Sequence, residues 1–133
     1  MSRKLFVNLP VRDLDATVAF FTRLGFSFDP EYTDANATCM RVGETAFVML
    51  LVEPFFAGFL DRPIAEARER AQVLLAVDAA DREAVDAMVA EAVAAGGRTF
   101  RPPQDHGFMY QHGFEDLDGH LWEVFHMSAP PPG

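Results

Sequence analysis

The sequence predicts an α+β fold made of two βαβββ modules, each a strand, a helix and three further strands. At 133 residues and 50% hydrophobic composition, the chain is long enough for one domain with a sizeable core. The strand–helix–strands pattern occurs twice, and Val11 of the first opening aligns with Val77 of the second, 66 residues later. Such a repeat implies two like sheets packed edge to edge around a concave groove, with helices on the convex side.

The first module is predicted over residues 4–53. Its helix begins at Asp13, keeps its apolar residues at helical spacing and ends at Gly25, which tolerates the left-handed backbone of a helix end. Turn-forming Asp, Asn and Gly residues separate the later strands. The predicted strands are residues 4–9, 26–32, 37–42 and 45–52.

A connector is predicted over residues 54–70, with a short helix near 55–60 between two prolines. The second module follows over 71–127, and its alanine-rich helix, 81–95, ends at a Gly-Gly pair. Its predicted strands are residues 72–77, 98–100, 107–115 and 120–127. Residues 128–133 are expected to form a frayed tail.

One carboxylate stands on the last predicted strand, directly after the tight turn Asp116–Gly119. Because side chains alternate across a strand, Glu123 shares a face with Leu121 and Phe125. Burying an unpaired carboxylate is costly, so Glu123 is expected either to face a cavity or to be paired.

Composition excludes several classes of partner. A net charge of −9 and a pI of about 4.7 argue against nucleic acid and anionic membranes. No signal peptide or spanning helix is predicted, and the single cysteine, Cys39, allows no internal disulfide. A cytoplasmic location is therefore expected.

Three motifs together resemble one known family. They run from Leu9 through Gly25 to Phe26, across Val77 and Asp78, and from Asp116 to Glu123. On these residues the chain is similar to the vicinal oxygen chelate superfamily, which groups glyoxalase I, ring-cleaving dioxygenases, and fosfomycin- and bleomycin-resistance proteins. The resemblance covers the chain from its first strand to its last and implies one domain over 1–133 and a homodimer.

The resemblance also implies a divalent metal held by side chains of the first, fourth, fifth and eighth strands. Phe6 stands where the family has His or Gln, and the fourth strand offers no carboxylate in residues 47–51. Gln72 and Glu123 remain as a partial metal site, too few ligands for high affinity. We therefore expect no cofactor; the open alternative is a metal completed by His106 or His112.

Strand parity predicts an apolar groove with a few polar groups, as is typical of pockets for organic molecules. The residues predicted to line it are Phe6, Asn8, Gln72, Leu74, Tyr110, His112 and Phe125. A second interpretation stays open, in which Asn8 and Gln72 only satisfy Glu123 or loop backbone. Likewise, His106 is either a base oriented by Asp105 or an ordinary loop residue.

Two specific functions are compatible with these residues, and a housekeeping domain with an unknown metabolite stays open as a third interpretation. The resemblance implies a glyoxalase-like, lactoylglutathione lyase-related protein that binds a small organic molecule at a degenerate metal site. If it is an enzyme, Glu123 is the base beside a carbonyl, which Gln72, Asn8 or His106 polarises. The alternative is a metal-free protein of the bleomycin-resistance type that sequesters a drug or metabolite, for which an acidic, aromatic groove suits a cationic aromatic ligand.

Overall fold

The computed structural model of the protein describes residues 2–132. Its contacts divide the chain into two compact units, Met1–Glu66 and Ala67–Gly133. Each unit contains one four-stranded sheet, which confirms the α+β class and the two βαβββ modules; their edge-to-edge packing stays a prediction. No helix among the described residues is long and apolar enough to cross a membrane.

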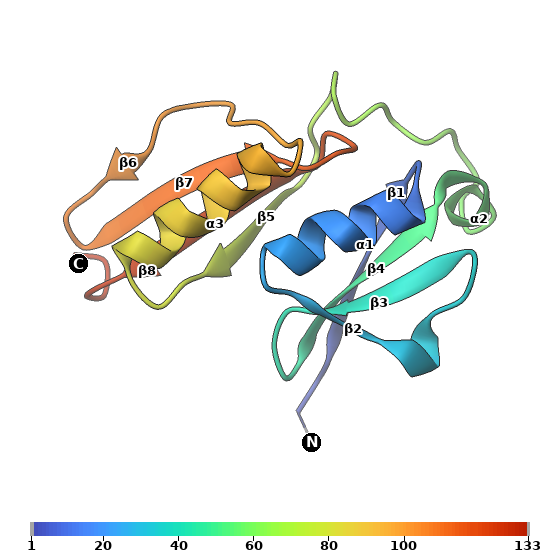
Figure 1. Cartoon of the computed structure of the whole chain (residues 1–133), viewed down its shortest axis with the longest axis horizontal. Helices are drawn as coiled ribbons and strands as arrows, with labels where there is room; N and C mark the ends of the chain where they lie inside the picture. The colour runs from blue at the N-terminus through green and yellow to red at the C-terminus, as the bar shows by residue number, and fades with distance from the viewer. Residues whose placement is uncertain (1, 133) are drawn as a thin grey trace. The chain divides into compact units, whose positions relative to one another are not determined.

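The first unit is a mixed sheet with α1 on one face (Figure 1). Its strand order is β1-β4-β3-β2, in which only β1 and β4 are parallel. The second strand is shorter than predicted, because Pro30 starts a 3-10 turn that Asp29 caps by accepting from the Glu31 N–H at 3.0 Å. The elements are β1 (Leu5–Val11), α1 (Leu14–Arg23), β2 (Ser27–Asp29), η1 (Pro30–Tyr32), β3 (Ala37–Arg41), β4 (Ala46–Val52) and α2 (Glu53–Ala57).

Helix α1 begins and ends where the sequence predicts. The Asp13 carboxylate accepts a hydrogen bond from the Ala16 N–H at 3.0 Å, which satisfies a backbone donor of the first turn. Gly25 adopts φ +102° just past the helix, a left-handed conformation that glycine accepts at little cost. Phe20 and Phe21 are almost fully buried, so this face of α1 forms the core of the unit.

The second unit repeats the arrangement, with α3 on its sheet and strand order β5-β8-β7-β6. The strand predicted at 98–100 is reduced to one bridge, Arg98 with Glu115, and the edge strand forms later. Between this bridge and the edge strand lie Pro102 and Pro103, which have no backbone N–H to donate and so interrupt the pairing with β7. The elements are β5 (Leu74–Asp78), α3 (Arg82–Ala94), β6 (Gln104–Asp105), β7 (Met109–Glu115) and β8 (Leu121–Met127).

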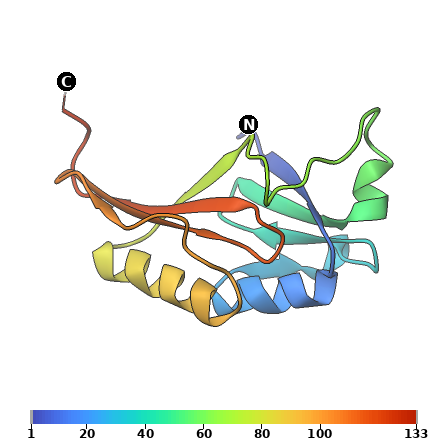
Figure 2. The ribbon, with the colours of Figure 1, turned by 90° about the horizontal axis from the view of Figure 1, so that it is seen from above.

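Each sheet has one face packed against its long helix, α1 or α3, and in the first unit the short helix α2 lies on the opposite side of the sheet (Figure 2). Leu9 and Val11 of β1 are buried on the α1 side, whereas Phe6 on the other face is 48% exposed. In the second sheet Trp122 and Val124 are buried on the α3 side, and Glu123 points the opposite way. We call the side opposite α1 or α3 the open face of each sheet; Asn8 and Glu123 lie on these faces.

A buried carboxylate organises the turn that leads into β8. Asp116 Oδ1 accepts from the N–H groups of Asp118 and His120 at 2.9 and 3.0 Å, and its Oδ2 accepts from Trp122 Nε1 at 3.1 Å. Gly119 in this turn has φ +90°, and a Cβ there would lie 2.9 Å from the Arg68 backbone nitrogen. The turn therefore fixes the start of β8 and the direction of its side chains.

We expect Asp116→Asn to lower the unfolding free energy by about 1–3 kcal/mol, because one of three buried donors loses its acceptor. Burial raises the pKa of Asp116 above that of the unfolded chain, against the opposing effects of His120 and the hydrogen bonds. Its contribution to stability is therefore present below the unfolded pKa and falls as pH rises through the folded one. Denaturant unfolding at several pH values should show that the difference in unfolding free energy between the wild type and the variant shrinks across that window. A difference that stays constant would show that folding does not raise the pKa of Asp116.

Candidate functional site

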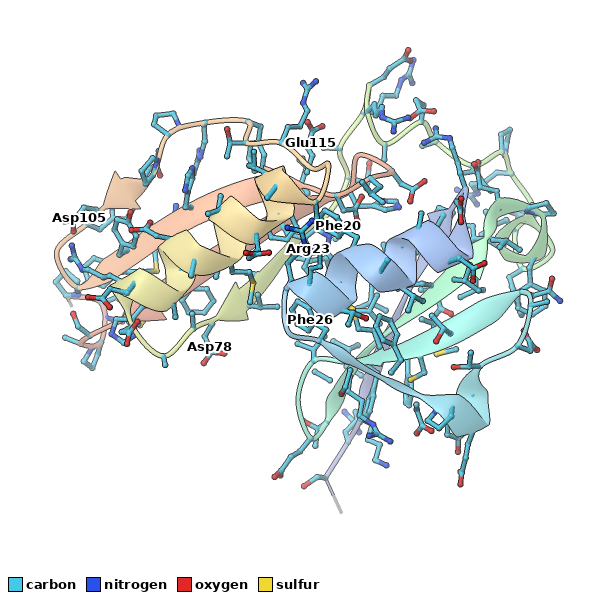
Figure 3. The ribbon with its side chains drawn as sticks, in the orientation of Figure 1. Phe20, Arg23, Phe26, Asp78, Asp105 and Glu115 are labelled. Atoms are coloured by element: carbon cyan, nitrogen blue, oxygen red, sulfur yellow. The ribbon has the colours of Figure 1, made fainter. Side chains whose placement is uncertain are left out.

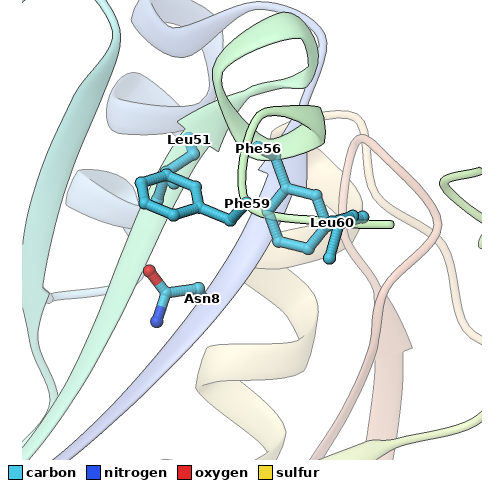
Figure 4. A pocket seen from close by; sticks show the side chains of 5 residues that line it. All are labelled: Asn8, Leu51, Phe56, Phe59 and Leu60. Carbon is cyan, nitrogen blue, oxygen red and sulfur yellow. The ribbon is translucent and has the colours of Figure 1, made fainter. Parts of the chain in front are cut away.

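A pocket lies on the open face of the first sheet (Figure 4). It encloses about 400 Å³, within the range of pockets for small organic molecules. Asn8 and Leu51 share the open face of β1 and β4, and the remaining walls come from α2 and the turn after it. The lining residues are Asn8, Leu51, Phe56, Phe59 and Leu60.

The pocket combines an apolar wall with a single amide. Asn8 Nδ2 donates to the Phe6 carbonyl oxygen at 3.4 Å, and Asn8 Oδ1 accepts no hydrogen bond from residues 2–132. Phe59 is 71% exposed, so the wall on that side is open to solvent. The arrangement suits an apolar molecule with one hydrogen-bond donor for Asn8.

Arg12 ties together both ends of the segment that supplies this wall. Its Nε lies 3.5 Å from a Glu53 oxygen at the start of α2, and its Nη2 lies 2.6 Å from a Glu66 oxygen at the end of the unit. All three side chains are about 40% exposed, so each ion pair contributes little to stability. Two weak ion pairs of Arg12 therefore hold the two ends of the segment 53–66 close to β1.

In the second unit, Glu123 is paired with a cation from the same unit. Its Oε1 lies 3.7 Å from Arg101 Nη2, and its side chain is only 12% exposed. Arg101 Nη2 also donates to Gln104 Oε1 at 3.0 Å, and Gln111 Nε2 donates to the same oxygen at 3.1 Å. The expectation that Glu123 faces a cavity or has a partner is met by this ion pair.

A second ion pair lies on the same open face. Arg98 Nε and Glu115 Oε2 are 2.5 Å apart, and Glu115 is as little exposed as Glu123. Glu115 ends β7, at the opposite end of this sheet from Asp105 (Figure 3). The open face therefore holds two nearly buried carboxylates, each neutralised by an arginine of the segment 98–101.

The residues present do not fit the family's metal site. The open-face residues of β4 are Phe47, Met49 and Leu51, which have no carboxylate, and Phe6 lies beside Phe47 in the register. Gln72 is exposed and precedes β5, so the prediction that it belongs to that strand is wrong. No three His, Cys, Asp or Glu residues among those described gather in a possible metal site. We derive no chemical step through a metal.

Tyr110 and His112 lie on the α3 side of the second sheet, so the prediction that they line a groove with Glu123 is wrong. They pair with His126 and Val124, whereas Glu123 pairs with Gly113. Tyr110 donates to Asp86 Oδ1 on α3 at 2.7 Å, a hydrogen bond that raises the pKa of the phenol. Tyr110 thus anchors β7 to the helix.

His106 lies in the exposed turn between β6 and β7, and its backbone N–H donates to the Met109 carbonyl oxygen at 2.8 Å. The carboxylate of Asp105 accepts from Arg82 at 2.7 and 2.8 Å, and this pairing lowers the pKa of Asp105. Asp105 is therefore engaged with α3 and does not orient His106, which leaves the interpretation of His106 as an ordinary loop residue.

The structure brings some predicted residues together within each unit. Phe6 and Asn8 share the open face of the first sheet, and Leu74 and Phe125 share that of the second with Glu123. The sequence interpretation missed the apolar wall of the pocket and did not establish the direction of Arg101. The available signal for this wall was the run of Phe and Leu at 55–60 after Pro54, because several apolar residues in a connector indicate that it packs against another apolar surface.

Comparison with known proteins identifies the fold and the family. A model of the glyoxalase/bleomycin resistance protein/dioxygenase superfamily matches residues 5–124. A hypothetical protein from S. aureus is similar at 25% identity and TM-score 0.80, with 94% of each chain covered. A comparison with curated proteins found no match.

Two further solved structures share the fold. An enzyme of the glyoxalase/bleomycin resistance protein/dioxygenase family from Burkholderia phytofirmans is 20% identical, with TM-score 0.78 over 95% of this chain and 99% of its own. A bleomycin resistance determinant encoded on the transposon Tn5 is 18% identical, with TM-score 0.65 over 96% and 100% of the two chains. At these identities the likeness extends to the fold alone.

We expect Gly113→Ala to destabilise the protein by about 1–3 kcal/mol. A Cβ at this position would lie 2.8 Å from both the Phe100 ring and the Trp122 carbonyl oxygen, next to Glu123. Gly43→Ala is the matched control, because a Cβ there meets nothing within 4 Å and the backbone is not left-handed. Equal midpoints of thermal or denaturant unfolding for the two variants would show that Phe100 does not pack over this strand.

Proposed function

The chain belongs to the glyoxalase/bleomycin resistance protein/dioxygenase superfamily, and from this premise we propose that it binds a small organic molecule without a metal ion. The observation that carries the proposal is the pocket of about 400 Å³ on the open face of the first sheet. The site works by enclosure and one hydrogen bond. The protein is thus a sequestering or carrier protein in the sense of the family's resistance members.

The pocket wall defines the class of ligand. Four of its five lining residues are apolar, and two of these are phenylalanines that stack well on aromatic rings. The single polar contact is Asn8 Oδ1, which accepts a hydrogen bond but cannot neutralise a charge. A neutral aromatic molecule with one N–H or O–H donor fits this wall better than the cationic ligand expected from net charge.

The charge arrangement around Glu123 supports metal independence. A carboxylate that serves as a metal ligand needs its charge available, and here an arginine only 3.7 Å away supplies the compensating charge. A lyase with Glu123 as base would also need a group to polarise the carbonyl. Gln72 and His106, two of the groups expected to do so, are exposed outside the strands. Homodimer formation stays a prediction of the resemblance, and a cytoplasmic location stays a prediction from the single cysteine and the lack of a predicted signal peptide.

Indole and 1-methylindole form a suitable pair of probes, because 1-methylindole has a methyl group in place of the N–H that would donate a hydrogen bond to Asn8. We expect indole to bind the metal-free protein and 1-methylindole to bind about 2–10-fold more weakly, the value of one hydrogen bond. Asn8→Leu should remove this difference, and Phe59→Ser should weaken both probes. Isothermal titration calorimetry or NMR titration, with and without EDTA, measures each affinity.

Tyr32→Ser is the control, since Tyr32 is an exposed aromatic residue of the same unit that does not line the pocket. It should leave both affinities unchanged. Binding that appears only after a divalent metal is added, or that Phe59→Ser and Asn8→Leu leave unaltered, would refute the proposal.

A further inference from the structure

We propose that Arg101 and Glu123 form a second ligand site, on the open face of the second sheet. The site would bind a neutral group that presents a carbonyl oxygen beside an N–H or O–H, such as a primary carboxamide. It rests on residues of the second unit alone and goes beyond the proposed function, which concerns the pocket of the first.

The Arg101 guanidinium is held in place before any ligand arrives. Its Nη2 donates to Gln104 Oε1 at 3.0 Å, and Gln111 fixes that oxygen with a second hydrogen bond at 3.1 Å. Glu123 Oε1 lies 3.7 Å from the same nitrogen. Pro102 follows directly and restricts the Arg101 backbone. Such positioning lowers the conformational entropy that ligand binding would otherwise cost.

Both partners keep hydrogen-bonding capacity for a ligand. Within residues 2–132, Nε and Nη1 of Arg101 donate to no acceptor, and Glu123 Oε2 accepts from no donor. The Arg101 side chain is 45% exposed, and no partly buried residue among those described has a buried side-chain nitrogen or oxygen without a partner, so Glu123 Oε2 also contacts solvent. The pair thus offers donors and an acceptor side by side, as a carboxamide requires.

Charge selects a neutral ligand over an ionic one. An anion that accepts from Arg101 would sit beside the Glu123 carboxylate, and a cation that donates to Glu123 would sit beside the guanidinium. Either ion gains one attraction and meets one repulsion at similar distance. A neutral group that both accepts and donates gains two hydrogen bonds to charged partners and meets no repulsion.

Aromatic side chains flank the pair. Glu123 is directly opposite Gly113 in the register, and the Phe100 ring lies over Gly113. Phe125 is two residues from Glu123 on the same open face, and both rings are partly exposed. An aromatic body attached to the carboxamide would therefore contact apolar surface.

Three probes with a common phenyl ring test the site: benzamide, benzoate and benzamidinium. Titration of the isotope-labelled full chain is followed by NMR at the Arg101 Nε–H and the Gly113 amide. We expect saturable shifts with benzamide and at least fivefold weaker binding of the two ionic probes. Arg101→Gln and Glu123→Gln should each weaken benzamide at least fivefold.

Arg98→Gln is the matched control, because Arg98 lies on the same segment but pairs with Glu115. It should retain benzamide binding, and an unchanged amide spectrum elsewhere shows that each variant is folded. Tighter binding of benzoate or benzamidinium, equal loss in Arg98→Gln, or no saturable shift at these two groups would overturn the proposal. Indole shifts confined to Asn8 and Phe59 report separately on the first pocket.

Discussion

The strict alternation of side chains across each four-stranded sheet is the constraint on which the rest of the structure depends. Because α1 and α3 each cover one face, the apolar residues of alternate positions form the two cores, and the intervening positions are left on an open face. This parity, rather than any loop, places both Asn8 and Glu123 on the open faces. A shift of one residue in either strand would bury the polar group and expose a core residue.

The open faces of the two sheets are covered by different kinds of side chain. In the first unit, α2 and its following turn cover apolar surface incompletely and leave a pocket. In the second, the segment 98–101 folds over the sheet, and its arginines neutralise two carboxylates that are almost out of water. A charge removed from water needs a partner close by, and here an arginine of the chain supplies one for each carboxylate.

Much of the fold could be predicted from local signals, and the site could be predicted only in part. The cap at Asp13, the stop at Gly25 and the direction of Glu123 follow from one or two residues each, and the structure confirms them. The contacts of Tyr110 with α3 and of Arg101 with Gln104 join residues whose approach depends on the folded chain. Strand alternation does not predict where the charged end of a long, flexible side chain such as that of Arg101 lies.

We infer that Arg101, rather than a metal ion, balances the charge of Glu123. Elemental analysis tests it most directly, on protein purified without added metal or chelator and again after soaking in nickel, zinc, manganese or iron and desalting. We expect well below one metal per chain under every condition, in the wild type and in Glu123→Gln alike. Close to one metal per chain in the wild type, lost in Glu123→Gln, would contradict it.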